Sequence, residues 1–120
     1  MDLDSLTETI IGSAYEVSNT LGAGFLQKIY ERALVGELSL RGIAVNAQVA
    51  YPVQYKGKLV GEYVPDLVVE NQGIVELKCV DQFAPLHVAQ CLSYLHVSGL
   101  KLALLLNFQY PKVQCRRVIS

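Results

Sequence analysis

The stretch VPDLVVENQGIVELKC, residues 64–79, carries two acids and a lysine inside segments that otherwise favour buried β-strands. Nine residues separate Asp66 from Glu76, and Lys78 follows two positions after Glu76. The turn residues Glu70-Asn71-Gln72-Gly73 lie between the two halves, so a hairpin would fold Asp66 back toward Glu76. The stretch therefore predicts two carboxylates that converge beside a lysine.

The expected site lies on one face of a sheet. Residues two apart in a strand share a face, so Glu76 and Lys78 point one way and Leu77 the other. Two partly buried carboxylates repel each other, and a cation relieves that repulsion. Mg²⁺ suits one or two carboxylates, retained waters and a phosphate, and the Leu77 backbone carbonyl offers one more oxygen. The pattern indicates metal-assisted attack of water on a phosphodiester, with Lys78 beside the reacting phosphate.

A structural alternative uses the same residues without chemistry. Glu76 and Lys78 would then form a solvated ion pair on one strand face, and Asp66 would be an acid close to a turn. The strand–turn–strand context favours the site over this alternative.

Length and composition bound the class of protein. The 120 residues fit one domain over residues 1–120, and 52% of them are hydrophobic, which predicts a homo-oligomer, in the simplest case a dimer, or a protein partner. The net charge of −1 argues mildly against a tight non-specific DNA binder. Three cysteines without a close pair and an acidic N-terminus without a secretory leader favour the reducing cytoplasm. No apolar run approaches the ~20 residues of a membrane span, so no membrane association is expected.

Periodicity and turn residues predict the order ααβββαββ, an α/β (α+β) fold with a central mixed sheet flanked by helices. The first helix is expected to start at a capping box formed by Ser5 and Glu8, and the second near Gly24. Pro65 lacks an N–H and should lie at a bend or a strand edge. The expected strands are residues 43–55, 59–69, 74–80, 101–107 and 113–119, and the third helix covers residues 85–97.

The chain resembles the PD-(D/E)XK nuclease superfamily in its element order and in its motif residues Pro65, Asp66, Glu76 and Lys78. The chain is most similar to its small bacterial and archaeal branch, the GxxExxY proteins. Similar blocks occur in the expected order through nearly the whole chain. These blocks are residues 21–26, 29–34, 55–57, 66–70, 75–78, 87–90, 94–95 and 105–108.

The resemblance implies a restriction-endonuclease-like core and a hydrolase that cuts nucleic acid. It makes Asp66 and Glu76 catalytic ligands of Mg²⁺ or Mn²⁺ and Lys78 the catalytic lysine. Gln90, on the helix that follows the third strand, would position the water or a phosphate. His87 and Tyr94 share one helical face with Gln90 and are accessory candidates.

Each helix candidate also has a structural interpretation. Gln90 would be a helix-surface amide and His87 a polar residue at the start of the helix. For Tyr94 a position in the core is favoured over a role in the site.

One position departs from the branch. Gln27 stands where the GxxExxY proteins carry the glutamate of their motif, and fewer anionic ligands weaken metal affinity. Glu31 lies one turn later, more than 5 Å along the helix axis, and is an accessory candidate that we do not expect to replace it. The alternative function is therefore a weakened or inactive nuclease-fold module that acts through a homo-oligomer or a protein partner.

Lys112, Arg116 and Arg117 form the only local cluster of basic residues. They are expected either to contact a nucleic-acid backbone or to guard the edge of the last strand, and the sequence leaves both open.

Zinc is a competing interpretation of Cys79, His87, Cys91 and His96. The set lacks the close paired ligands that are typical of structural zinc, so buried thiols are the favoured interpretation.

Overall fold

The computed structural model describes residues 1–120 and contains three helices and seven strands. None of the three helices combines the length and the apolar character that crossing a lipid bilayer requires. The helices are α1 (Leu3–Leu21), α2 (Gln27–Leu40) and α3 (Pro85–Ser98), and the strands are β1 (Val45–Ala47), β2 (Tyr51–Tyr55), β3 (Lys58–Tyr63), β4 (Leu67–Val69), β5 (Gly73–Lys78), β6 (Leu102–Asn107) and β7 (Gln114–Ile119).

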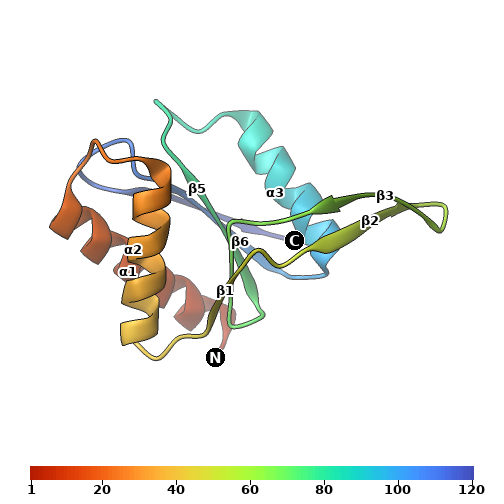
Figure 1. Ribbon diagram of the computed structural model, residues 1–120, viewed down its shortest axis with the longest axis horizontal. Coiled ribbons are helices and arrows are strands. Elements are labelled where there is room, and N and C mark those ends of the chain that lie inside the picture. The colour runs from red at the N-terminus through yellow and green to blue at the C-terminus, as the bar shows by residue number, and fades with distance from the viewer.

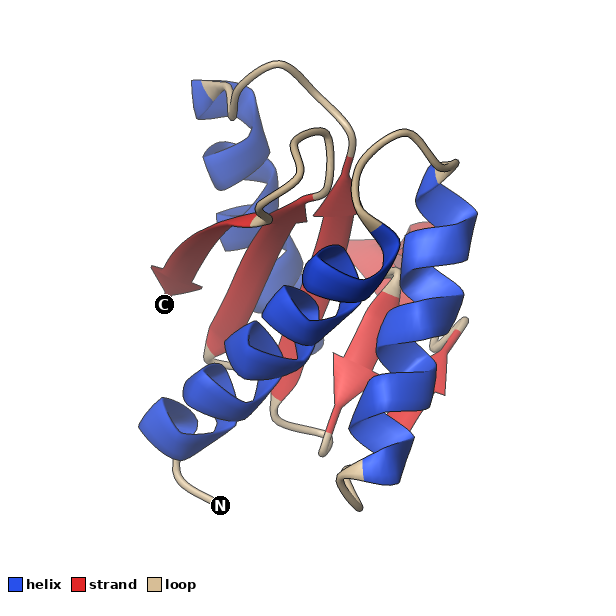
Figure 2. Cartoon of the chain, turned by 90° about the vertical axis from the view of Figure 1, so that its left-hand side faces the viewer, coloured by secondary structure: helices blue, strands red, loops and turns tan.

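A five-stranded mixed sheet in the order β1-β4-β5-β6-β7 forms the centre of the molecule. β5 and β6 are parallel and are joined by the crossover helix α3, while the other neighbours are antiparallel. Figure 2 shows α1 and α2 covering one face of the sheet, with α3 behind the other. The larger core cluster lies under α1 and α2 and the smaller one under α3. The predicted mixed sheet flanked by helices is confirmed.

Two of the predicted strands are each divided in two. The strand expected over residues 43–55 breaks at Gln48, whose backbone is left-handed (φ 61°), and gives β1 and β2. The strand expected over residues 59–69 breaks at Val64-Pro65-Asp66 and gives β3 and β4, in keeping with the bend predicted at Pro65. The inner pieces join the sheet, and the outer pieces pair only with each other.

The outer β2–β3 ribbon, residues 51–63, is named the arm here. It leaves the sheet and projects beside α3, with which β2 is in contact (Figure 1). The molecule accordingly extends 47 Å in its longest direction and 22 Å in its shortest. The arm departs from the sheet immediately before Asp66, so its base adjoins the expected site.

The first two helices, α1 and α2, start at residues that differ from the prediction. α1 begins three residues earlier than expected, because the Asp2 carboxylate caps it by accepting a hydrogen bond from the Ser5 N–H at 2.8 Å. The capping box expected from Ser5 and Glu8 is therefore wrong. α2 begins at Gln27, because Gly24 has a φ of 106°, which no right-handed helix contains.

Candidate active site

β5 directs alternate side chains to opposite faces of the sheet. Val75 and Leu77 are buried in the cluster under α1 and α2, whereas Ile74 is buried in the cluster under α3. Glu76 and Lys78 continue the alternation of Ile74 and therefore face α3. The predicted sharing of one face by Glu76 and Lys78 is confirmed.

Asp66 and Glu76 meet at the point where the arm leaves the sheet. The Asp66 N–H donates to Glu76 Oε1 at 3.4 Å, and the Leu77 N–H donates to Asp66 Oδ2 at 2.8 Å. β4 and β5 pair Leu67 with Val75, so continuing their register places Pro65 opposite Leu77. Proline has no N–H to donate, which leaves the Leu77 carbonyl without a partner from that strand.

Burial dominates the electrostatics of Glu76, whose exposed fraction is 8%. Removal from water, and to a smaller extent the charge of Asp66, raise the pKa of this carboxyl to about 7. A hydrogen bond from the Tyr63 hydroxyl to Oε1 acts in the opposite direction, as does the charge of Lys78. Glu76 is thus held close to half ionised near neutral pH, and a cation would favour its charged form.

Tyr63 is a site residue that sequence reasoning missed. Its ring stacks on Tyr94 of α3, with centroids 3.8 Å apart and an interplanar angle of 11°, and Tyr51 lies across the arm at 6.5 Å. Burial, followed by the contact with Glu76, raises the pKa of the Tyr63 hydroxyl, so this group remains a donor. The available signal was an aromatic residue three positions before Asp66, at the end of a strand.

One oxygen of each carboxylate remains free. Asp66 Oδ1 and Glu76 Oε2 accept no hydrogen bond from the protein, and no fully buried side-chain oxygen or nitrogen lacks a partner. Both oxygens must therefore reach the surface. Two accessible carboxylate oxygens fit a hard cation that keeps several waters. No group of three or more His, Cys, Asp or Glu side chains is available, so the remaining ligands would be the Leu77 carbonyl, water and phosphate.

Lys78 and Gln90 are both half-buried and uncommitted. Lys78 is the last residue of β5 and forms no ion pair, although its charge lowers the pKa of Glu76. Gln90 lies one turn before Tyr94 on α3, and its amide makes no hydrogen bond within the protein. Neither side chain would have to break a hydrogen bond or an ion pair within the protein in order to bind a phosphate.

The α2 candidates form no hydrogen bond or ion pair with the two carboxylates of the site. Gln27 is the exposed first residue of α2, and Glu31 pairs with Lys28 at 2.5 Å. Neither residue bonds to Asp66 or Glu76. Tyr30, the tyrosine of the same motif, is fully buried: its hydroxyl donates to the Gly22 carbonyl at 2.7 Å and stabilises the α1–α2 connection.

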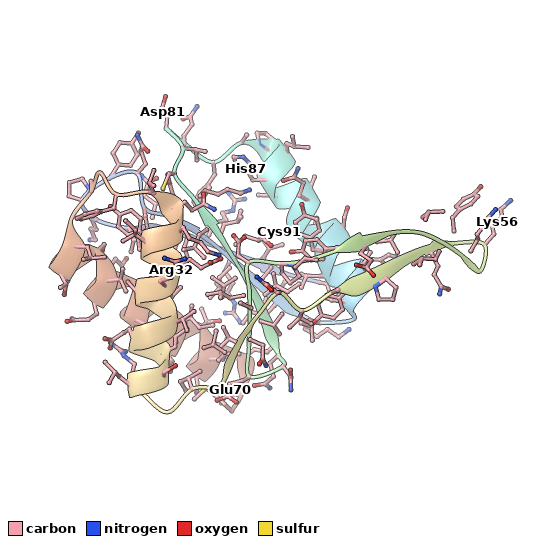
Figure 3. The ribbon with its side chains drawn as sticks, viewed as in Figure 1. Arg32, Lys56, Glu70, Asp81, His87 and Cys91 are labelled. Atoms are coloured by element: carbon pink, nitrogen blue, oxygen red, sulfur yellow. The ribbon has the colours of Figure 1, made fainter.

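His87 lies at the start of α3, as Figure 3 shows, and its Nδ1 accepts a hydrogen bond from the Ala84 N–H at 3.0 Å. The imidazole thus caps the helix. The zinc alternative is wrong, because Cys79 packs under α1 and α2 while Cys91 is buried under α3, on the opposite face of the sheet.

The basic cluster is divided between the two faces of the sheet. Arg117 pairs with Asp4 of α1 at 2.8 Å, and the Lys112 ammonium lies over the ring of Tyr15. Arg116 points to the other face, where it lines a hollow of about 340 Å³ beside Phe83. The three cations do not form one patch around the candidate site.

The three surface hollows of the molecule lie away from the carboxylates. One lies between α1 and α2, one is the hollow beside Arg116, and one lies near the N-terminus at Leu3 and Lys101. Asp66, Glu76 and Lys78 line none of them. The candidate site is an open corner between the arm, the sheet and α3.

A comparison of the sequence with protein families gives a match over nearly the whole chain. A family model described as "PD-(D/E)XK nuclease superfamily" matches residues 4–118. No curated protein matches the chain in sequence.

Solved structures with the same fold include an alkaline exonuclease, LHK-Exo, from Laribacter hongkongensis. It is 14% identical, with a TM-score of 0.51 over 89% of this chain and 76% of that chain. The LHK-Exo complex with dAMP is 12% identical, with a TM-score of 0.54 over 95% of this chain and 82% of that chain. At these identities the likeness shows the fold.

Proposed function

The chain belongs to the PD-(D/E)XK nuclease superfamily, and from that membership we propose that it is a divalent-metal-dependent nuclease. The observation that carries the proposal is the convergence of Asp66 and Glu76 on one corner, each with one free and accessible oxygen. Lys78 stands on the same strand face as Glu76. Two carboxylates that can bind a metal ion thus lie beside the Lys78 ammonium, which can stabilise the negative charge that develops when a phosphodiester is hydrolysed.

Each site residue has a proposed role. Asp66, Glu76 and the Leu77 carbonyl would hold Mg²⁺ or Mn²⁺, which supplies Lewis-acid activation of the phosphodiester and of water. The Lys78 ammonium would stabilise negative charge that develops on the phosphate. Gln90 would orient the attacking water or a phosphate oxygen from α3.

Nucleic acid is the proposed substrate. The site is an open corner outside the three surface hollows, which suits a strand lying on the surface better than a small molecule enclosed in a cavity. LHK-Exo, which shares the fold, is described as an alkaline exonuclease. We propose the same class of reaction here, hydrolysis of the nucleic-acid backbone.

Three finer proposals accompany this function. Within the superfamily, the GxxExxY branch is the proposed placement, supported by the sequence blocks that resemble it. A homo-oligomer is proposed because the arm exposes Tyr55, Leu59 and Val60 with exposed fractions of 64%, 58% and 60%. A reducing compartment such as the cytoplasm is proposed because Cys79, Cys91 and Cys115 are all unpaired.

A cleavage panel tests the proposed function. Purified protein is incubated with end-labelled single- and double-stranded DNA and RNA in EDTA, Mg²⁺ or Mn²⁺. We expect metal-dependent cleavage that falls by at least about a hundredfold in Asp66→Ala and in Lys78→Ala, since each removes charge from the reacting centre. Circular dichroism must show that both variants are folded. Cleavage that is unchanged in folded Asp66→Ala would refute the assignment.

A further inference from the structure

The Glu76 carboxylate has few sources of hydrogen bonds. Its exposed fraction of 8% leaves little room for water, and the Asp66 N–H is a long contact at 3.4 Å. The Tyr63 hydroxyl is the remaining donor and reaches the same oxygen, Oε1. The other oxygen, Oε2, stays free and accessible.

Tyr63 is itself held in place from two sides. Its ring lies nearly parallel to that of Tyr94 on α3, with centroids 3.8 Å apart, and the ring of Tyr51 approaches from the neighbouring strand of the arm. A phenol whose ring is packed in this way presents its O–H in a fixed direction. The donor is therefore preorganised before any cation arrives.

We propose that Tyr63 is a positioning residue of the metal site, which holds Glu76 through Oε1 so that Oε2 is presented to the cation. The proposal rests on the proposed function and adds to it a residue outside the Asp-Glu-Lys set. A hydrogen bond from outside the ligand set fixes a ligating carboxylate, and loss of such a partner typically costs about 10–100-fold in metal affinity or activity.

The arm gains a role through this contact. Tyr63 is the last residue of β3, so one end of the arm hydrogen-bonds to the site while its turn, marked by Lys56 in Figure 3, is far away. The arm then contributes to the site through Tyr63, although neither of its strands belongs to the central sheet.

Calorimetric titration with Mn²⁺ alone tests the proposal on four forms of the full chain. Tyr63→Phe removes one oxygen and retains the ring stack. Tyr94→Phe is the matched control, because it removes a hydroxyl from the other ring of the same stack and that hydroxyl makes no hydrogen bond. Asp66→Ala and the unaltered protein define the absence and presence of the site.

We expect Tyr63→Phe to weaken Mn²⁺ binding about 10–100-fold and Tyr94→Phe to change it less than about twofold. In Tyr63→Phe the Mn²⁺ concentration that gives half-maximal cleavage should rise by a similar factor. The cleavage rate of this variant at saturating Mn²⁺ should approach that of the unaltered protein. A role confined to packing would move neither quantity.

Two different failures are separable. If the unaltered protein binds Mn²⁺ and Asp66→Ala does not, but Tyr63→Phe binds as well as the unaltered protein, the positioning role is wrong and the proposed function stands. If the unaltered protein and Asp66→Ala bind Mn²⁺ equally or not at all, the metal site is wrong, and the role of Tyr63 is overturned with it.

Discussion

Glu76 is where stability and function conflict most clearly. A carboxyl group with an exposed fraction of 8% is more stable in the protonated form, and its pKa of about 7 reflects that burial. Cation binding, however, needs the ionised form. The folded protein therefore carries a destabilising charge at neutral pH in the absence of a metal, in keeping with the metal-binding role proposed for Glu76.

Replacement of Glu76 by glutamine should stabilise the metal-free protein while abolishing cleavage. The folded carboxyl binds its proton more tightly than the unfolded one, whose pKa is near 4.5, so its contribution to stability falls as pH rises from about 4.5 to 7. The stability of Glu76→Gln relative to the unaltered protein should therefore increase by about 2 kcal/mol between pH 5 and pH 8.

Urea unfolding in EDTA at the two pH values measures this difference. The pH dependence of all other groups is shared by the two proteins and cancels in the comparison. A difference in stability that is the same at pH 5 and pH 8 would show that Glu76 titrates normally.

At the scale of elements, local sequence signals located most of the fold. The Lys56-Gly57 turn has positive φ at both residues, as a tight hairpin requires, and Gly99 ends α3 in the left-handed conformation. The bend at Pro65 followed from its missing N–H, but the break at Gln48 did not follow from residue type. A left-handed glutamine is held by its surroundings, so a single sequence gives no local signal for it.

For the candidate site, as for the fold, the sequence predicts the features that depend on local signals and misses those that depend on tertiary packing. The convergence of Asp66 and Glu76 follows from the short turn over residues 70–72 and from strand alternation, both of which are local properties. The contact between Tyr63 and Glu76 depends on the angle at which the arm leaves the sheet, and the position of Gln27 depends on how α2 packs. Tertiary packing sets both, and no sequence period encodes it.

Asn107 fixes the segment that follows β5. It is fully buried at the end of β6, where Oδ1 accepts from the Val80 N–H at 3.1 Å and Nδ2 donates to the Val80 carbonyl at 2.8 Å. Nδ2 also donates to Gln114 Oε1 at 3.1 Å. The amide thereby holds the chain two residues beyond Lys78.

Removal of this amide should be costly for stability. Asn107→Ala leaves both polar groups of Val80 without partners, and we expect a loss of about 2–3 kcal/mol in the free energy of unfolding. Gln114→Ala is the control, because it removes a single bond at an exposed residue and should cost less than about 1 kcal/mol. Equal losses in the two variants, measured by urea unfolding, would contradict the role given to Asn107.

At the scale of the whole molecule, the arm is the part of the sheet structure that has no strand partner in the central sheet. Both of its strands pair only with each other, and an isolated two-stranded ribbon is marginally stable in water. Its exposed Leu59 and Val60 would be covered in an assembly. The arm therefore supports the proposed homo-oligomer.

Light scattering at high protein concentration tests this assembly. We expect a mass of at least twice the 13.2 kDa of one chain, and a reduced mass in the double variant Leu59→Lys, Val60→Lys. Leu40→Lys is the control, since Leu40, at the end of α2, is an apolar residue that is even more exposed than Leu59 and Val60. A monodisperse monomer would count against the oligomer, and an equal loss of mass in the control would place the interface elsewhere than on the arm.

The central claim is that the Asp66–Glu76 corner holds the cation on which cleavage depends. Anomalous diffraction from crystals grown with Mn²⁺ tests it most directly, because this measurement locates the metal independently of any substrate. The account predicts a peak within bonding distance of Asp66 and Glu76 that disappears in Asp66→Ala. A peak only at other residues, or none at Mn²⁺ concentrations that support cleavage, would contradict it.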